Sequence, residues 1–178
     1  DEKIHRVRRQ SSDAEEINDA IKLLKSAKRP MIIAGGGIQY SGAVSELTEF
    51  ADKFQIPVVE TIAGRANLLD THDLNIGPLG VTGSNSANNI AEQADVILAI
   101  GTRLQDFTTG SWTAFSTDAK IICLNAARHD AAKHLSLPIV GDAKLGLNSL
   151  STGLIGYKAS SDWIDNARKE RAKWNEYV

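Results

Sequence analysis

A run of five apolar residues, Val96–Ile100, constrains the fold of this chain more than any other stretch of its sequence. The run contains no polar residue, and Gly101 closes it. A short, uninterrupted apolar run is typical of a strand that is buried on both faces, as in a parallel sheet. The polar residues Thr102 and Arg103 follow at the point where the chain leaves this strand. Because ligands of open α/β sheets bind outside the carboxyl ends of the strands, we expect a binding site to begin there.

Further apolar runs predict strands at residues 31–34, 57–60, 120–124 and 137–140. Apolar residues at helical spacing predict helices at residues 12–28, 41–54, 84–94, 142–150 and 163–174, the last packing on this domain or leading into another. Residues 61–82 and 102–118 are predicted to be mostly loop. Ser12 in a capping box with Glu15, then Ser41, and then Ser84 or Ser86 are predicted to cap helices. This alternation predicts βαβ units with right-handed crossovers.

Length and charge exclude several classes of protein. The 178 residues suit one domain, and the dispersed charges, with a formal net charge of −2, offer no nucleic-acid surface. No apolar run approaches the roughly 18 residues of a membrane span. The single cysteine, Cys123, excludes an internal disulfide and indicates a cytoplasmic protein. Residues 1–11 read as a solvated linker, and a chain that begins at Asp1 is expected to be a piece of something longer. That linker carries the basic cluster Lys3, Arg6, Arg8 and Arg9.

The triple glycine Gly35, Gly36 and Gly37 lies where a phosphate loop would lie, between a strand and a helix. The dinucleotide pattern G-x-G-x-x-G fails, however, because Tyr40 occupies its last position. Glu60 ends the second strand, near the place of a ribose-binding acid. Two interpretations stay open, a tight turn with an ordinary strand-end glutamate and a NAD site. No G-x-x-x-x-G-K-[ST] occurs in the sequence, which excludes a P-loop.

No residue has a defensible catalytic or metal-binding role. Cys123 lies between Ile122 and Leu124 inside a strand, which predicts a core thiol. No G-x-S-x-G elbow and no zinc motif occur, and Asp70, His72 and Asp73 read as solvated loop residues. The histidines are scattered along the chain, at His5, His72, His129 and His134.

Several motifs in order make the chain similar to a known family. They read P-M-I-I-A-G-G-G, P-V-V-E-T, G-R-A, G-P-L-G-V-T-G-S-N-S-A-N, A-D-V-I-L-A-I-G-T-R-L-Q-D and P-I-V-G-D-A-K. This series resembles the central domain of thiamine-diphosphate-dependent enzymes over residues 12–155. Two further segments, D-F-T-T-G-S-W-T-A-F-S and N-A-A-R-H-D-A-A-K-H, are most similar to the branch that hydrolytically opens a cyclic 1,2-diketone in myo-inositol catabolism.

The resemblance implies a three-layer αβα domain with a six-stranded parallel sheet, Rossmann-like, over residues 12–155. Residues 156–178 would be a helix or linker toward a missing catalytic domain. Flanking domains of the same chain would bind thiamine diphosphate and Mg²⁺, and the parent would be a homo-oligomer. The magnesium motif G-D-G is absent here, since Ala143 follows Asp142. We therefore expect the chain alone to be inactive as a hydrolase.

In some members of this family the central domain binds FAD or ADP. The resemblance carries that groove onto Gly35, Gly36, Gly37, Arg65, Gly80, Gly83, Gly101, Thr102, Arg103, Asn125 and Asp142. Two departures weaken it, because Asn125-Ala126-Ala127 replaces an acidic motif and Phe107 replaces a second arginine. Together they predict a vestigial, empty or weakly occupied groove.

Three alternatives to this interpretation remain. They are an FAD- or ADP-binding domain of an acetolactate-synthase-like enzyme, a stand-alone adenine-nucleotide-binding module, and half of a NAD-dependent dehydrogenase. The aromatic residues Trp112 and Phe115 either line an interface or pocket, or pack over the end of the sheet.

Overall fold

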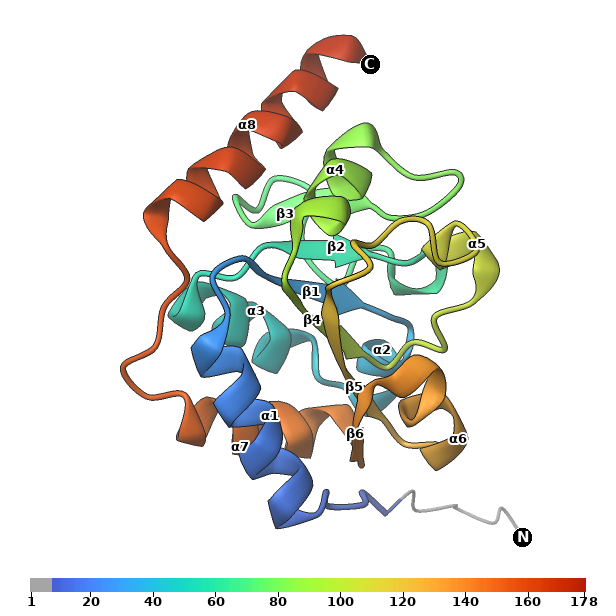
Figure 1. Ribbon diagram of the computed structural model, residues 1–178, viewed down its shortest axis with the longest axis vertical. Helices are drawn as coiled ribbons and strands as arrows, with labels where there is room; N and C mark the ends of the chain where they lie inside the picture. The colour runs from blue at the N-terminus through green and yellow to red at the C-terminus, as the bar shows by residue number, and fades with distance from the viewer. Residues whose placement is uncertain (1–7) are drawn as a thin grey trace, which may run out of the picture.

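The computed structural model describes residues 8–178 as a six-stranded sheet between two layers of helices (Figure 1). Every strand pair is parallel, and the order is β3-β2-β1-β4-β5-β6. The strands are β1 Pro30–Ala34, β2 Val58–Glu60, β3 Asn75–Pro78, β4 Val96–Ile100, β5 Lys120–Asn125 and β6 Leu137–Val140. This confirms the expected three-layer, Rossmann-like α/β fold. Residues 1–7, which include Lys3, His5 and Arg6 of the predicted linker, lie outside the described residues.

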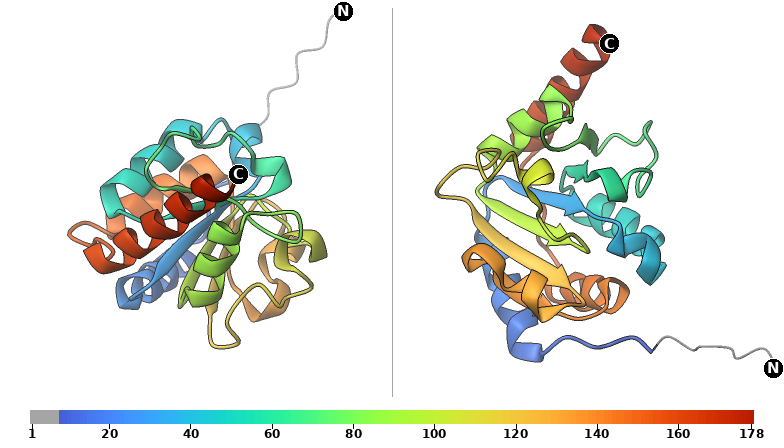
Figure 2. Two further views of the ribbon diagram at one scale, coloured as in Figure 1. Left: turned by 90° about the horizontal axis from the view of Figure 1, so that it is seen from above. Right: turned by 90° about the vertical axis from the view of Figure 1, so that its right-hand side faces the viewer.

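Helices cover both faces of the sheet (Figure 2). They are α1 Ala14–Ser26, α2 Gly37–Ser41, α3 Val44–Phe54, α4 Asn85–Gln93, α5 Asp106–Thr109, α6 Arg128–Ala131, α7 Ala143–Gly153 and α8 Ser161–Tyr177, with 3-10 turns η1 Ile62–Gly64 and η2 Lys133–Leu135. Helix α7 packs against α1 and α3, whereas α4 lies on the opposite face beside α8. The connection from β1 to β2 crosses one face of the sheet, and the connection from β3 to β4 crosses the other. These two connections run in opposite directions across the sheet, and right-handed connections that run in opposite directions lie on opposite faces.

The centre of the sheet is apolar on both sides, as the sequence predicts. All five residues of β1 and all five of β4 are buried, and the two strands pair over their whole length from Pro30 beside Val96 to Ala34 beside Ile100. In β5 the side chain of Cys123 is fully buried, and its burial raises the pKa of the thiol to about 12. A protonated thiol inside the sheet is a poor nucleophile, so the prediction of a core cysteine is confirmed.

One strand lies inside a segment predicted to be mostly loop. Strand β3 pairs with β2 at the edge of the sheet, although its sequence, Asn-Ile-Gly-Pro, lacks the apolar run of a buried strand. Side-chain contacts hold it in place: the Asn75 carboxamide accepts a hydrogen bond from the Gly77 amide and donates to the Leu68 carbonyl. Gly77 adopts a φ of 110°, which suits glycine. The segment is mostly loop as predicted, but the apolar pattern missed this strand because the strand depends on tertiary contacts.

Two predicted helix caps are wrong. Asp13, not Ser12, caps α1, since its carboxylate accepts from the amides of Glu15 and Glu16. Ser41 is the last residue of α2, and α3 begins at Val44 without a side-chain cap.

Two other expectations about these helices have opposite outcomes. The apolar spacing of Val44, Leu47, Ala51 and Phe54 predicts one buried stripe on α3. Val44 is 38% exposed, however, and the buried residues of α3 are Leu47, Phe50, Ala51 and Phe54. Ser84 does cap α4, as one of the two predicted alternatives, because its hydroxyl accepts from the Ala87 amide.

The last helix, α8, packs on this domain. It runs beside α4 and β3, and the buried indole of Trp163 donates a hydrogen bond of 2.8 Å to the Pro30 carbonyl. Arg171 forms an ion pair of 2.7 Å with Asp70 at the same face. The boundary near residue 155 between a core domain and a C-terminal segment stays a prediction. Within residues 8–178, no helix combines the length and the hydropathy needed to cross a membrane.

If α8 is part of the domain, Trp163→Phe should lower the free energy of unfolding by about 1–3 kcal/mol, because the buried Pro30 carbonyl loses its partner. Trp174→Phe, on the same helix but only partly buried, should change it by less than about 0.5 kcal/mol. Urea denaturation of both variants measures this. Equal losses in the two would show that the indole hydrogen bond does not hold α8 in place.

Candidate functional site

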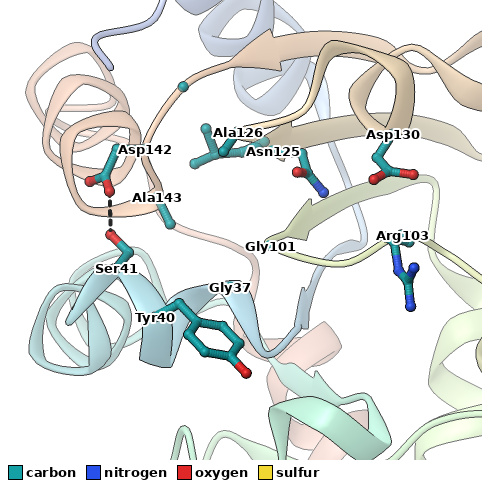
Figure 3. Close-up of a pocket in the computed structure, with 12 residues that line it drawn as sticks. Gly37, Tyr40, Ser41, Gly101, Arg103, Asn125, Ala126, Asp130, Asp142 and Ala143 are labelled. Carbon is teal, nitrogen blue, oxygen red and sulfur yellow. Dashed lines mark hydrogen bonds between the residues drawn. The ribbon is translucent and has the colours of Figure 1, made fainter. Parts of the chain in front are cut away.

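The sheet changes direction between β1 and β4, where the chain leaves β1 toward β2 but leaves β4 toward β5. This is the topological switch point, at which ligands of open α/β sheets bind. Two hollows of about 370 and 520 Å³ adjoin it, and Gly37, Tyr40, Gly101 and Arg103 line both. The smaller hollow lies between Tyr40 on one side and Asn125 on the other (Figure 3). The structure therefore brings the predicted glycines after β1 together with the predicted residues after β4.

The loops after β1 and β4 touch through their main chains. The Gly37 amide donates to the Gly101 carbonyl at 2.9 Å, and the Gly35 amide donates to the Ile100 carbonyl at 2.8 Å. A Cβ atom on Gly37 would lie 2.6 Å from the Gly101 Cα, and one on Gly35 would overlap the Gly101 carbonyl. Gly101 itself has a φ of 59°. Glycine is required here because the two backbones are in contact, whether or not a ligand is present.

The first amides of the helix that follows the triple glycine donate within the protein. Helix α2 has five residues, and its first amides donate within the protein: Gly37 to Gly101, Gln39 to Gly36 at 3.1 Å, and Tyr40 to Gly36 at 3.3 Å. A phosphate-binding helix terminus needs unpaired N–H groups. The observed hydrogen bonds thus support the tight-turn interpretation of residues 35–37.

Asn125 ends β5 and is also committed to the fold. Its carboxamide donates to the Thr102 carbonyl at 2.9 Å and accepts from the Ala127 amide at 3.1 Å. The Thr102 hydroxyl accepts from the Leu104 amide, and Thr102 is only 8% exposed. Both predicted binding residues therefore tie the loop after β4 to the end of β5.

Asp142 lies at the start of α7 and joins three segments. Its carboxylate accepts from the Lys144 and Leu145 amides as the N-cap, from the Ser41 hydroxyl at 2.9 Å, and from the Arg9 guanidinium at 2.8 and 2.9 Å. Burial acts to raise the pKa of Asp142, but the hydrogen bonds from Arg9 and Ser41 outweigh it and hold the pKa below its usual value. The carboxylate is charged and fully engaged, and an incoming phosphate would be repelled by it.

Arg103 differs from its neighbours. In the part of the chain that the structure describes, its exposed guanidinium forms no hydrogen bond or ion pair, although it borders both hollows. Its side chain is therefore available to a ligand in either hollow.

Three more predicted site residues, Arg65, Gly80 and Gly83, line neither hollow. Arg65 is exposed, 3.9 Å from the Glu60 carboxylate, and the buried Glu60 accepts from the Leu68 amide at 3.0 Å. Glu60 thus holds the loop after β2, as an ordinary strand-end glutamate would. The Asn88 carboxamide forms two hydrogen bonds of 3.0 Å with Gly80, accepting from the Gly80 amide and donating to the Gly80 carbonyl. Gly83 packs on the Pro78 carbonyl.

The aromatic residues of the loop after β4 pack on each other. Trp112 and Phe115 form a T-shaped pair with ring centroids 5.9 Å apart, and Phe115 is 8% exposed. The ring of His134 lies tilted on Trp112 with ring centroids 3.5 Å apart, in a contact that no local pattern predicts. These contacts favour packing over the end of the sheet as the role of both aromatic residues.

The acidic loop near His72 forms ion pairs with neighbouring helices. Asp70 pairs with Arg171, Asp73 lies 3.6 Å from Arg168, and His72 lies 3.3 Å from Asp52. Among residues 8–178, no three His, Cys, Asp or Glu side chains gather in a way that could hold a metal ion.

Sequence reasoning missed several contacts and exposures around these hollows. Arg9 and Asp142 are 133 residues apart, and no local pattern signals their contact. Asn67 is buried and donates to the Gly35 carbonyl at 3.0 Å from the middle of a predicted loop. Tyr40, Ile62 and Phe107 line the larger hollow while largely exposed, which only the folded chain reveals.

Comparisons with known proteins agree on one family. A family model described as "Thiamine pyrophosphate enzyme, central domain" matches residues 17–150. Relatives named "3D-(3,5/4)-trihydroxycyclohexane-1,2-dione hydrolase" include those of Geobacillus thermodenitrificans, 41% identical over 97% of this chain, Clostridium tetani, 39% over 98%, and Bacillus subtilis, 39% over 97%. The chain spans 27% of the length of each of these relatives.

The engagement of Asp142 predicts a specific pH dependence. The pKa of Asp142 is lower in the folded protein than in the unfolded chain. The ionised carboxylate therefore stabilises the fold at pH values above the unfolded pKa, and this stabilisation is lost as the pH falls toward the folded pKa. Asp142→Asn keeps a capping residue but loses the charge opposite Arg9. We expect it to be about 1 kcal/mol less stable at pH 7, since Arg9 is partly exposed, and to lose less stability between pH 5 and pH 3.

Urea midpoints at several pH values measure this difference, with Asp118→Asn at an exposed site as the matched control. A parallel pH dependence of Asp142→Asn and the unchanged protein would contradict the assignment.

Proposed function

The chain belongs to the family of thiamine pyrophosphate enzymes, as their central domain, and from this premise we propose that it is the architectural domain of a thiamine-diphosphate-dependent hydrolase. The parent enzyme would open the ring of a trihydroxycyclohexane-1,2-dione at a carbon–carbon bond. Water would supply a hydroxyl to one carbonyl carbon, which becomes a carboxylic acid, and a hydrogen to the other, which becomes an aldehyde. The domain would space and orient the two catalytic domains that flank it.

The relatives carry this proposal. Eight of them, 35–41% identical to this chain, share the same hydrolase name, and each alignment covers at least 96% of the chain. Since the chain spans about 27% of their length, most of the parent's residues, and its chemistry, lie in the remainder. Thiamine diphosphate and its divalent metal ion would be held there.

The side chains of this domain support an architectural role. The buried Glu60 and the partly buried Asp142 are hydrogen-bonded within the fold, and the cysteine is a core thiol. A general acid or base must be free to reach a substrate proton, and a nucleophile must be exposed and ionisable. We therefore assign no catalytic residue to this chain.

A nucleotide-binding function is the second candidate, favoured by the 520 Å³ hollow and the available guanidinium of Arg103. The remaining residues do not fit the diphosphate of FAD or ADP. The amides of α2 donate within the protein, Asp142 places a negative charge beside the smaller hollow, and Asn125 donates to Thr102. Each lost partner weakens such a site by about 1–3 kcal/mol. We infer a groove that binds nucleotides weakly or not at all.

The proposed activity is tested by expressing the parent enzyme and this chain separately. The parent, supplied with thiamine diphosphate and a divalent cation, should release one acid per ring opened, followed in a pH-stat. This chain alone should release none. Hydrolysis by the isolated chain would refute the absence of catalytic residues. A parent that condenses pyruvate and leaves the diketone intact would identify an acetolactate-synthase-like enzyme instead.

The groove is tested by calorimetric titration of the chain with FAD, ADP and NAD in turn. We expect no micromolar binding of any of them. Micromolar binding of FAD or ADP that disappears in Arg103→Ala would establish a working nucleotide site. Binding of NAD would favour a dehydrogenase half.

A further inference from the structure

Four large apolar side chains are exposed at one edge of the sheet. Tyr40, Ile62, Val81 and Phe107 are 96%, 63%, 66% and 66% exposed, and we refer to them as the apolar rim. They follow the carboxyl ends of β1, β2, β3 and β4 respectively. Because all the strands are parallel, these four ends meet at the same edge.

Three side chains of the rim lie around one hollow, and the fourth residue adjoins it through its main chain. Tyr40, Ile62 and Phe107 line the same 520 Å³ hollow, and the Val81 amide donates to the Phe107 carbonyl at 2.9 Å. Scattered apolar side chains on a protein surface need no explanation, whereas a contiguous patch marks an interaction site.

The backbone beneath the rim is fixed by hydrogen bonds. The Thr61 hydroxyl accepts from the Gly64 amide and closes η1 under Ile62. The Asn88 carboxamide holds Gly80 next to Val81. A surface presented by constrained loops loses little conformational entropy when a partner binds.

The parts of the chain that lead to other segments of the parent lie at this same edge. Arg9 is tied to Ser41, at the end of α2, and to Asp142, just beyond the carboxyl end of β6. Helix α8 runs against α4 in the opposite direction, so that its last turn, with Tyr177, adjoins Asn85 just beyond the carboxyl end of β3 (Figure 1). The chain spans 27% of its relatives' length, so in a parent of that length the flanking parts would connect at this edge.

We propose that the apolar rim is the docking surface for a flanking domain of the same parent chain, with Arg103 receiving a carboxylate or carbonyl oxygen from that domain. This rests on the proposed function, in which the parent is a multidomain thiamine enzyme. The flanking domain covers the larger hollow and removes the four side chains from water. Arg103 lies among them, which fixes the register of the contact.

The test uses the full-length parent with single cysteines at rim and control positions. Ile62→Cys and Phe107→Cys probe the rim, and Ile155→Cys, 71% exposed between α7 and α8, is the control. The rate of maleimide labelling at each site is measured by peptide mass spectrometry and divided by the labelling rate of the same site in urea. No nucleotide is present at first. We expect the rim cysteines to label about tenfold or more slowly than the control. Cys123 remains unlabelled because it is buried.

A second readout identifies the covering segment. A photo-crosslinker on Phe107→Cys, in a mixture of isotopically light and heavy parent chains, should form links within one chain to residues outside this domain. Links between light and heavy chains would assign the rim to a second copy and overturn the proposal. Rim labelling as fast as the control would also overturn it, as would protection that appears only when ADP or FAD is added.

Failure here is distinct from failure of the proposed function, because labelling does not depend on the reaction. A parent that hydrolyses the diketone with an unprotected rim would refute only the docking surface. A protected rim in a parent with another substrate would refute only the activity.

Discussion

The main-chain contact between the loops after β1 and β4 determines the character of this domain. In a parallel sheet that changes direction between two strands, the loops beyond them usually part and leave a crevice for a ligand. Here Gly35 and Gly37 bring one loop against Gly101 of the other, and amide–carbonyl hydrogen bonds close the gap. The crevice becomes two open hollows on either side of a glycine contact. At this switch point the amides of Gly35, Gly37 and Gly101 all donate within the protein.

The polar residues around this contact act as ties between segments. Asn125 joins β5 to the loop after β4, Asp142 joins α7 to α2 and to Arg9, and Glu60 holds the loop after β2. Buried polar groups that are fully paired stiffen a structure and favour one arrangement of its parts. A rigid carboxyl edge suits the architectural role proposed above. The two acids that lie in these contacts, Glu60 and Asp142, are engaged by hydrogen bonds.

What could be predicted from the sequence follows from the range of each interaction. Continuous apolar runs identify β1, β4 and β5, because a strand that is buried on both faces needs apolar residues at successive positions. Strand β3, by contrast, is an edge strand whose Asn75 and Gly77 satisfy each other, and its residues look like a turn. The switch point was predictable from the order of motifs, whereas the commitment of Asp142 was not, since Arg9 lies 133 residues away. Spacing along the chain can identify a residue's type of environment but not its distant partners.

The strand order also governs how the protein can assemble as it is synthesised. Strand β1 can pair with Val58–Glu60 soon after both have left the ribosome, but its other edge waits for Val96–Ile100. During that interval a fully apolar strand has an unpaired edge, the kind of surface through which nascent chains stick to one another. The N-terminal segment waits longer still, because Arg9 finds its carboxylate only when the start of α7 emerges. The time taken to synthesise the residues between β2 and β4 therefore sets how long this edge stays unpaired.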